Sequence, residues 1–271
     1  MAQTVWKGHL TFGLVSVPIR LYAAARSETV SFNQLHKACG SRVKQKLFCP
    51  TCEKTVERAE LVKGAEVDGG RFVLVEESDL QAIQPESGTS MEVLEFVKLD
   101  EVDPVYFDTS YYMVPENKAG EKPYFLLQKS LQQMNHAAIA RLSKANKEHI
   151  VIVRPSGKGL MLHTLYYQDE VRQVADYGQD EAVQLSDKEL DLGKLFVSSL
   201  AAGFDPSKYH DRYRENVTSM IAAKAQGQTI AAAAPAAPPP AMDLMAALKA
   251  SLERTQQQAS PALDPSVTAQ G

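Results

Sequence analysis

Apolar and polar residues alternate along the first part of the chain. From Thr4 to Tyr22 the apolar side chains fall mostly on alternate positions, and Gly8 and Gly13 interrupt the pattern. A period of two is typical of strands with one buried face, and the glycines favour tight turns. The same reasoning predicts further strands at residues 71–76, 92–99, 111–115, 139–142, 149–154 and 160–166. So many short strands favour a barrel or a strongly curled sheet.

One helical pattern interrupts the strands. Pro123 precedes the apolar run at residues 124–127, and Leu131 and Met134 continue it at helical spacing. Proline is favoured at the first position of a helix, because an N–H at that position would have no partner within the helix. The pattern therefore predicts a helix that begins at Pro123. Together with the strands, it predicts a mainly β protein with some α-helix, whose core spans residues 1–185.

Helical patterns dominate residues 186–227. Ser186 and Glu189 have the spacing of a capping box, which predicts the start of a helix that stops at Gly203. Asp205 is predicted to cap the next helix, and Gly227 lies just beyond its predicted end. This region is predicted to be the helical C-terminal part of the folded core.

A spacer and a short helix follow the predicted core. Residues 228–241 are rich in alanine and proline, a composition typical of an extended linker. Residues 242–258 predict an amphipathic helix, which either docks a partner protein or folds back onto its own core. The tail at residues 259–271 has low hydrophobicity and is predicted to be disordered. The apolar face of the predicted helix consists of Leu244, Met245, Leu248 and Leu252.

Charge is distributed unevenly along the chain. The 271 residues carry a net charge of −4, which disfavours a nucleic-acid-binding protein when the chain is taken as a whole. Residues 1–63, however, contain ten Lys and Arg against four Glu, a net charge of +6, so the remainder carries −10. The positive end could attract phosphate while the rest of the chain repels it.

Two features bear on the compartment. The N-terminus lacks a basic region followed by a long apolar run, and no stretch approaches the roughly 18 apolar residues of a membrane span. We therefore expect a cytoplasmic protein with no membrane partner. The three cysteines lie within fourteen positions, and this odd, clustered set suits a local metal site better than a disulfide framework.

The cysteines belong to a pattern with the spacing of a zinc site. His36, Cys39, Cys49 and Cys52 supply two pairs of ligands. Four protein ligands leave no open coordination position, so the zinc would be structural rather than catalytic. The segment between the pairs must bend, because a straight strand there would hold them roughly 25 Å apart at about 3.3 Å per residue. In the alternative interpretation, His36 is a packed core histidine.

A row of cations lies between the two pairs. Arg42, Lys44 and Lys46 recur at every second position, so an extended chain would place them on one face of a strand. Such a row could follow DNA phosphates. The alternative is a solvated strand edge, where lysines commonly protect against aggregation.

The sequence offers no pattern of catalytic residues. His136, His149 and His163 stand singly among apolar neighbours, without a nucleophile or carboxylate at a telling spacing. Phosphate-cradling glycine loops and a nucleotidyl-transfer lysine motif are also missing. We therefore expect a protein that is not an enzyme and requires no cofactor, and we interpret these histidines as packed or surface residues.

Long segments of the chain resemble the bacterial Ku proteins of non-homologous end joining. In the first part they are WKGHLTFGLVSVPIRLYAA, VSFNQLHK, GSRVKQKLFCPTC and ELVKGAEVDGGRFVLVEESDL. Further along they are DEVDPVYFDTSYYMVP, KPYFLLQKSL, AIARLSKANKEHIVIVRP, LMLHTLYYQDEVR and DLMAALKASLE. The resemblance covers most of residues 4–226 and the last predicted helix, so it is far more specific than any short motif.

The resemblance implies a Ku-type β-barrel core with a DNA-encircling arm at about residues 30–63 and a helical C-terminal region. Two copies would form a ring-shaped homodimer that threads onto double-stranded DNA ends and contacts mainly phosphate. The family recruits ligase D and has no nucleotide cofactor; bound to DNA, the protein would be associated with the nucleoid. The candidate DNA-binding residues are Lys37, Arg42, Lys44, Lys46, Lys54 and Arg58.

Two alternatives of other functional classes stay open at this point. One is a zinc-containing DNA-processing enzyme, which would need acid or base residues that the sequence does not reveal. The other is a protein–protein adaptor whose C-terminal helix is the main functional surface. Binding to linear but not circular duplex DNA would favour the ring over both.

Overall fold

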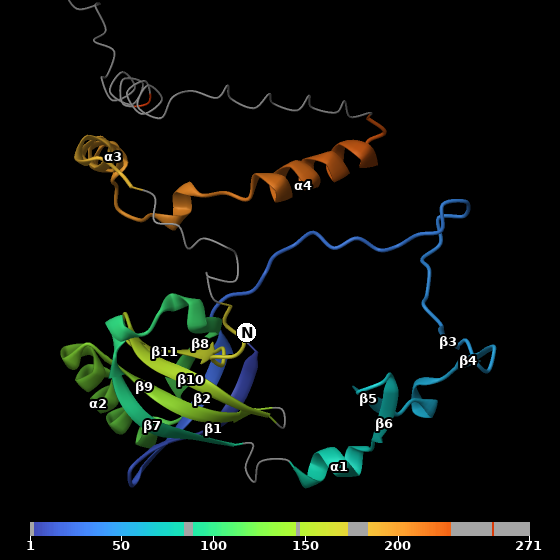
Figure 1. Cartoon of the computed structure of the whole chain (residues 1–271), viewed down its shortest axis with the longest axis horizontal. Helices are drawn as coiled ribbons and strands as arrows, with labels where there is room; N and C mark the ends of the chain where they lie inside the picture. The colour runs from blue at the N-terminus through green and yellow to red at the C-terminus, as the bar shows by residue number, and fades with distance from the viewer. Residues whose placement is uncertain (1–2, 84–88, 145–146, 173–183, 229–250, 252–271) are drawn as a thin grey trace, which may run out of the picture. The chain divides into compact units, whose positions relative to one another are not determined.

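The computed structural model describes residues 3–83, 89–144, 147–172, 184–228 and 251. Within these residues the centre of the fold is a closed barrel of seven strands (Figure 1). In order around the barrel they are β1 (Thr4–Phe12), β2 (Val15–Ala23), β8 (Phe107–Pro115), β11 (Gly159–Leu165), β10 (Lys147–Ser156), β9 (His136–Lys144) and β7 (Ser90–Lys98). Neighbouring strands are antiparallel except β7 and β1, which close the barrel in parallel. The predicted β-barrel is confirmed.

The alternating pattern at the start of the chain produces the first hairpin of the barrel. Leu10 on β1 and Val17 and Ile19 on β2 are fully buried, whereas the residues between them face outward. Gly13 in the connecting turn has a φ of 58°, a conformation that glycine adopts without steric cost. Inward-facing side chains of this kind from all seven strands fill the interior of the barrel as one hydrophobic core.

A tryptophan completes the seam between β1 and β7. The two strands pair over only three residues, and Trp6 lies beyond them. Its indole Nε1 donates a hydrogen bond to the carbonyl oxygen of Ser143 on β9, at 3.1 Å. A Cβ at Gly8 would overlap both the Trp6 ring and the carbonyl oxygen of Thr89, so glycine at this position makes room for the indole.

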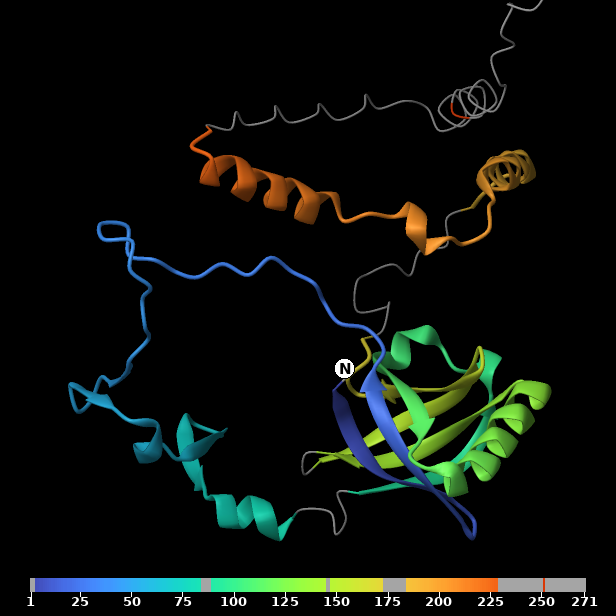
Figure 2. The same ribbon diagram turned by 180° about the vertical axis from the view of Figure 1, so that it is seen from behind.

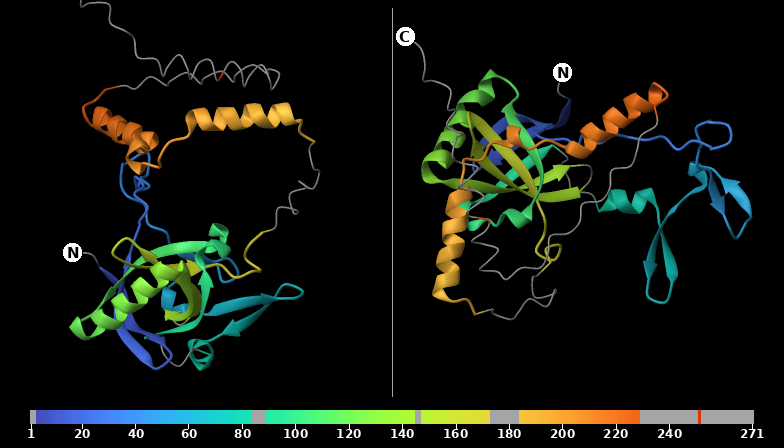
Figure 3. Two further views of the ribbon diagram at one scale, coloured as in Figure 1. Left: turned by 90° about the vertical axis from the view of Figure 1, so that its left-hand side faces the viewer. Right: turned by 90° about the horizontal axis from the view of Figure 1, so that it is seen from above.

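The helix α2 (Lys118–Met134) packs against the barrel (Figure 3). It begins five residues before Pro123, so the prediction that this proline starts the helix is wrong. The side chain of Asn117 caps the helix by accepting a hydrogen bond from the backbone N–H of Gly120, at 3.1 Å. This cap satisfies a helix-terminal donor and sets the start, and Pro123 is accommodated inside the helix.

Tyr124 connects α2 to the strands. Its hydroxyl donates to the carbonyl oxygen of Met113, at 2.7 Å, and accepts from the backbone N–H of Leu160, at 2.8 Å. Burial raises the pKa of the Tyr124 phenol, so the hydroxyl keeps the proton that it donates. One buried side chain therefore satisfies backbone groups of both β8 and β11.

Between β2 and β7 the chain leaves the barrel as an arm, defined here as residues 24–83 (Figure 2). No side chain in these residues is buried, so the arm has no hydrophobic core of its own. The strand predicted at residues 71–76 forms as β6, but it belongs to an arm hairpin and not to the barrel. The elements of the arm are β3 (Leu47–Cys49), β4 (Lys54–Val56), η1 (Arg58–Glu60), β5 (Lys63–Val67), β6 (Arg71–Val75) and α1 (Glu77–Ala82).

The chain divides into two compact units, residues 1–177 and 178–271. The second contains α3 (Asp187–Leu200), η5 (Pro206–Lys208) and α4 (Arg212–Ala225). The predicted capping box of α3 is confirmed, because Ser186 and Glu189 each accept a hydrogen bond from the backbone N–H of the other, at 3.4 and 2.8 Å. The helix ends three residues before Gly203, which is not its stop.

The next predicted helix begins later than the sequence pattern indicates. Asp205 accepts from the backbone N–H of Ser207, at 3.0 Å, and starts only the 3₁₀ turn η5. The cap of α4 is Asp211, which accepts from the N–H of Arg214 at 2.9 Å. The predicted end is confirmed, since Gly227 follows the helix with a φ of 79°.

Two short 3₁₀ turns, η2 (Leu99–Glu101) and η3 (Pro104–Tyr106), connect β7 to β8. Among the described residues, no helix combines the length and apolar character needed to cross a membrane. Apart from residues 228 and 251, the predicted linker at 228–241, helix at 242–258 and tail at 259–271 lie outside the described residues.

Candidate nucleic-acid interface

The basic residues predicted to bind DNA are exposed on the arm. Within the described part of the chain none of them takes part in an ion pair. Two other arm cations do, Arg26 with Glu28 at 2.9 Å and Lys63 with Glu77 at 3.1 Å. Cations without a carboxylate partner can neutralise phosphate without first giving up an internal ion pair. The six exposed residues are Lys37, Arg42, Lys44, Lys46, Lys54 and Arg58.

The row of alternating cations does not lie on a strand. Arg42 forms an isolated bridge with Leu35, and β3 begins only after Lys46. The strand considered from the sequence at residues 41–48 is therefore not formed. The chain at Arg42 pairs back on itself and then enters the β3–β4 hairpin, so Lys44 lies in a connection without a neighbouring strand among the described residues.

His36 and Cys39 lie in one tight turn. The Nδ1 atom of His36 is 3.1 Å from the Sγ atom of Cys39, and the N–H of Gly40 donates to the carbonyl oxygen of His36 at 2.8 Å. Hydrogen bonds from the side chain and backbone of Ser41, and then from His36, lower the pKa of Cys39 to about 7. A thiol that ionises near neutral pH is a ready metal ligand.

Cys49 and Cys52 form a second pair at the turn between β3 and β4. The backbone and the thiol of Cys52, and then the backbone of Thr51, stabilise the Cys49 thiolate and lower its pKa. The pKa of Cys52 is raised, because its thiol donates to Cys49 and a second thiolate beside the first is disfavoured. The two thiols therefore ionise in steps, and a divalent cation would favour ionisation of both.

The structure brings the four predicted zinc ligands together as two pairs and not as one site. No three His, Cys, Asp or Glu side chains of the described segments are grouped so that they could hold a metal ion. The chemistry of each pair fits zinc, which prefers thiolate and imidazole ligands in a tetrahedron. The present arrangement of the two turns does not form one tetrahedral zinc site. Both pairs could bind the same zinc only if the two turns moved closer to each other.

A polar cluster on the barrel has the residue types of a catalytic dyad but not the geometry. Ser110 Oγ is 2.8 Å from His163 Nδ1, and Arg154 Nε donates to His163 Nε2 at 2.9 Å. Because Nε2 accepts, the neutral ring carries its proton on Nδ1 and cannot remove the proton of Ser110 as a general base. Phe107 stacks on the ring, with centroids 5.0 Å apart. The interpretation of His163 as a packed histidine is confirmed.

A cationic cluster on the barrel was not identified from the sequence. Lys7 on β1 and Arg20 on β2 are cross-strand partners, and the Oε1 atom of Glu116 lies 2.6 Å from Lys7 Nζ and 3.1 Å from the Arg20 guanidinium. Hydrogen bonds from Lys7 and then Arg20 lower the pKa of Glu116. Arg20 and Glu116 are 96 positions apart, so no local spacing could reveal the contact. The only sequence signal was the lack of any acidic residue before Glu28.

The second unit presents apolar side chains to solvent. No residue of α3 is buried, and Phe204, Tyr209 and Tyr213 are 84%, 73% and 76% exposed. Phe204 and Tyr209 stack on each other, with ring centroids 6.2 Å apart. The residues predicted to dock a partner, however, lie outside the described part of the chain: Leu244, Met245, Leu248 and Leu252.

Comparisons with known proteins give a match over most of the chain. Residues 11–192 match the family model described as the Ku70/Ku80 beta-barrel domain. A non-homologous end joining protein Ku of Solibacter usitatus is 46% identical over 256 residues, which cover 94% of this chain and 95% of that protein. Proteins of the same name from Koribacter versatilis and Bacillus subtilis are 45% and 34% identical, over 95% and 99% of this chain and 88% of each relative.

Proposed function

The chain belongs to the Ku family of non-homologous end joining proteins, and from this premise we propose that it binds the ends of double-stranded DNA breaks without sequence specificity. In this proposal it acts as a ring-shaped homodimer, is not an enzyme, and recruits and stimulates ligase D, which supplies the chemistry. The proposed compartment is the cytoplasm, on the nucleoid when DNA is bound. A reducing compartment suits the three free cysteines.

The arm is the observation that carries the proposal. It leaves the barrel after β2 and returns to it at β7, and none of its side chains is buried. A segment that buries no core of its own is typically completed by a partner or a metal. Its six exposed, unpaired cations match the charge of a phosphate backbone, which favours DNA as that partner.

A ring accounts for selectivity toward DNA ends. A preformed ring can be threaded only at a free end, so it discriminates linear from circular duplex without contacting base edges. Phosphate contacts then supply affinity that is independent of sequence and falls with salt. This mode of binding requires no catalytic group.

The homodimer is supported by the second unit. Phe204, Tyr209 and Tyr213 are close together in the sequence and all exposed. Single exposed apolar residues are common on protein surfaces, whereas several together are typical of an interaction surface. In our proposal a second copy of the chain covers this surface, which would contribute to a two-fold symmetric interface.

Structural zinc in the arm is a further part of the proposal. Cys39 and Cys49 have lowered thiol pKa values, and each belongs to a ligand pair on its own turn. Zinc bound by both pairs would link two turns of a segment that lacks a hydrophobic core, which is a common role of zinc in small domains. The zinc would order the arm and would take no part in a reaction.

Recruitment of ligase D is assigned to the predicted helix at residues 242–258. Its apolar face of Leu244, Met245, Leu248 and Leu252 follows a proline-rich spacer, an arrangement typical of a tethered docking helix. The spacer would let the helix reach the ligase while the core remains on DNA.

The proposal is tested with full-length protein, without ligase, on linear and covalently closed circular duplexes of the same sequence. We expect salt-sensitive retention of the linear form and little retention of the circle after a brief high-salt challenge, because only a threaded ring is trapped on DNA. Equal retention of the two forms would contradict the ring. Strand cleavage or base removal in either form would instead favour a DNA-processing enzyme.

A further inference from the structure

The three cysteines of the chain all lie in the arm, and two of them are in contact with each other. The thiol of Cys52 donates a hydrogen bond to the sulfur of Cys49. Cys52 is exposed and Cys49 is half-buried, so small molecules in the solvent reach both. Two neighbouring thiols that are separated by two residues have the chemistry of a dithiol that can close to a disulfide.

The backbone of the β3–β4 turn keeps this pair together. Cys49 is the last residue of β3 and lies opposite Lys54, the first residue of β4, across the hairpin. Glu53 closes the turn with a φ of 50°, in the left-handed region that non-glycine residues seldom adopt outside turns. The local turn therefore sets the spacing of the two sulfur atoms, whatever the path of the rest of the arm.

The third cysteine, Cys39, is separate from this pair. Its sulfur lies 3.1 Å from Nδ1 of His36, in the preceding turn of the arm. Among the described residues, no three His, Cys, Asp or Glu side chains are close enough to share a metal ion, so Cys39 is not beside the other two thiols. Oxidation within one chain therefore joins Cys49 to Cys52 and leaves Cys39 outside the bond.

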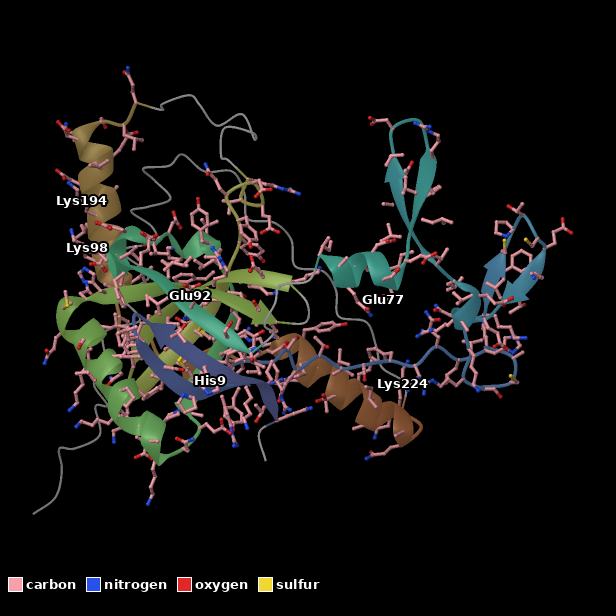
Figure 4. The ribbon with its side chains drawn as sticks, turned by 90° about the horizontal axis from the view of Figure 1, so that it is seen from below. His9, Glu77, Glu92, Lys98, Lys194 and Lys224 are labelled. Carbon is pink, nitrogen blue, oxygen red and sulfur yellow. The ribbon has the colours of Figure 1, made fainter. Side chains whose placement is uncertain are left out.

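The pair lies in the part of the arm that carries the candidate DNA-binding cations. Lys46 directly precedes β3, and Lys54 begins β4. A two-stranded hairpin with no buried side chain is only marginally stable in water. Lys63 pairs at 3.1 Å with Glu77, which Figure 4 labels at the start of α1, but both side chains are exposed and such ion pairs stabilise little. The chemical state of the two sulfur atoms therefore has a large effect on how firmly this region is held.

We propose that Cys49 and Cys52 form a reversible redox site, at which hydrogen peroxide oxidises the two thiols to a disulfide and thereby weakens DNA binding by the arm. This inference rests on the proposed DNA-end binding and the proposed zinc, and it adds a regulation to both. Two S–H bonds break and one S–S bond forms, and the two electrons and two protons that are released reduce one hydrogen peroxide to two water molecules. Disulfides in a reducing compartment are typically transient and serve in redox sensing.

The disulfide and zinc exclude each other. Zinc takes thiolates as ligands, and the two sulfur atoms of a disulfide no longer carry that charge. When the thiolates hold zinc, they give up the same two electrons, water supplies the two protons, and the metal leaves. His36 and Cys39 then remain as two ligands, too few for a tetrahedral site. The arm loses the link between its two turns, so Lys44 and Lys46 between them gain conformational freedom that DNA binding must remove.

The first measurement identifies the disulfide in full-length protein. Reduced protein is treated with a small excess of hydrogen peroxide, catalase removes the peroxide, and free thiols are alkylated before peptide mass spectrometry. We expect Cys49 and Cys52 to be joined, and Cys39→Ser to form the same bond. Cys49→Ser is the matched control: it also keeps two thiols, but they are not neighbours, so it should form no disulfide within the chain.

The second measurement follows the consequences for metal and DNA. A chromogenic chelator reports zinc that leaves the protein on oxidation, and fluorescence anisotropy of a labelled blunt duplex reports affinity. We expect the oxidised wild type to release its zinc and to bind the duplex several-fold more weakly, and dithiothreitol with added zinc should restore both. Cys49→Ser should bind as weakly as the oxidised wild type before any treatment, and peroxide should not change its affinity further.

The outcomes separate this inference from the proposed function. If reduced wild type does not bind linear duplex, the proposed function is wrong, and the peptide measurement still decides whether Cys49 and Cys52 form a disulfide. If reduced wild type binds, the redox site is wrong when peroxide forms no such disulfide or forms it without loss of affinity. Reduced protein that binds DNA but holds no zinc would contradict the coupling to the metal. A loss of affinity that dithiothreitol and zinc do not reverse, or that Cys49→Ser shares, would place the damage elsewhere on the chain.

Discussion

Arg154 on β10 donates a hydrogen bond from Nε to the Nε2 atom of His163 on the neighbouring strand β11, at 2.9 Å. The arrangement requires a neutral imidazole, because a protonated ring has no acceptor to offer and would face a second positive charge. Burial and then the charge of Arg154 lower the pKa of His163. The cluster is therefore intact only while His163 is unprotonated.

This relationship predicts a loss of barrel stability at acidic pH. In the unfolded chain His163 takes up a proton below its ordinary pKa of about 6.5, whereas the folded protein resists protonation. The contribution of His163 to stability should be constant above that pH and fall as pH decreases from there toward the lowered pKa. Urea unfolding at pH 7.5 and pH 5.5 measures the difference.

The matched variant for this prediction is His163→Gln, whose amide can still accept from Arg154 but does not titrate. Its unfolding free energy should fall less than that of wild type between the two pH values, because Gln does not titrate. Glu116 and Glu189 do not add a difference, since their pKa values are lowered and they stay ionised in both proteins over this range. If the unfolding free energies of the two proteins fall equally between pH 7.5 and pH 5.5, protonation of His163 is not the cause of the loss of stability.

The arm cations should control DNA affinity irrespective of sequence. The double substitution Lys44→Glu and Lys46→Glu is expected to weaken binding strongly and to flatten its salt dependence, by a slope of about 0.9 for each phosphate that is no longer neutralised. Lys122→Glu with Lys129→Glu makes the same charge change at exposed positions of α2 and serves as control. If the Lys44 and Lys46 double variant binds DNA with wild-type affinity, these two residues are not part of the DNA-binding surface, which must then lie elsewhere on the chain.

Zinc is expected at one equivalent per chain in gently purified protein, measured by elemental analysis. Cys49→Ser should lose the metal and make the arm more sensitive to protease, while the barrel keeps its thermal transition, because no arm side chain is part of the barrel core. Thr51→Ser in the same turn should retain the metal. Substoichiometric zinc in the wild type would contradict the site.

The barrel was predictable from the sequence because its signal is local. Alternating residues such as Leu10 and Val17 fall on one face of each strand whatever the strand pairs with. Its closure was not predictable, since the parallel pairing of β1 with β7 and the contact of Trp6 with Ser143 join distant segments. The predicted start of α2 at Pro123 was wrong, because the cap at Asn117 starts the helix earlier. The predicted cap at Asp205 was also wrong, because this residue caps the turn η5 and not α4.

The candidate site shows the same division. The short spacing between His36 and Cys39 correctly predicts that their side chains lie together. Whether this turn lies beside the turn with Cys49 depends on the conformation of the arm between them, which has no hydrophobic core to hold it. The cluster of Lys7 and Arg20 requires the register of a hairpin and a glutamate contributed by a third strand's end. Patterns within a few residues are therefore informative, and contacts set by tertiary pairing are not.

The final prediction concerns the C-terminal segment, and deletion of residues 229–271 tests it. Four apolar residues at helical spacing contribute about 1.5–3 kcal/mol each when fully buried, enough for micromolar affinity after the segment is ordered on its partner. The truncated protein should therefore still dimerise and retain linear DNA but no longer stimulate ligase D. Leu244→Asp with Leu248→Asp should reproduce the defect in the full-length chain, and Ser251→Ala should not.

The opposing possibility is that the helix packs on its own core, because the eleven-residue alanine and proline stretch at 231–241 within the linker imposes only a weak entropic barrier to folding back. Thermal unfolding distinguishes the two: a packed helix would stabilise the core, so its deletion would lower the transition temperature, whereas a free docking helix would leave it unchanged. Full ligase stimulation by the truncated protein would place the ligase-binding surface on residues 1–228. A joint loss of stimulation and thermal stability would favour an indirect effect of the helix on the core, and only loss of stimulation at unchanged stability supports a tethered docking helix.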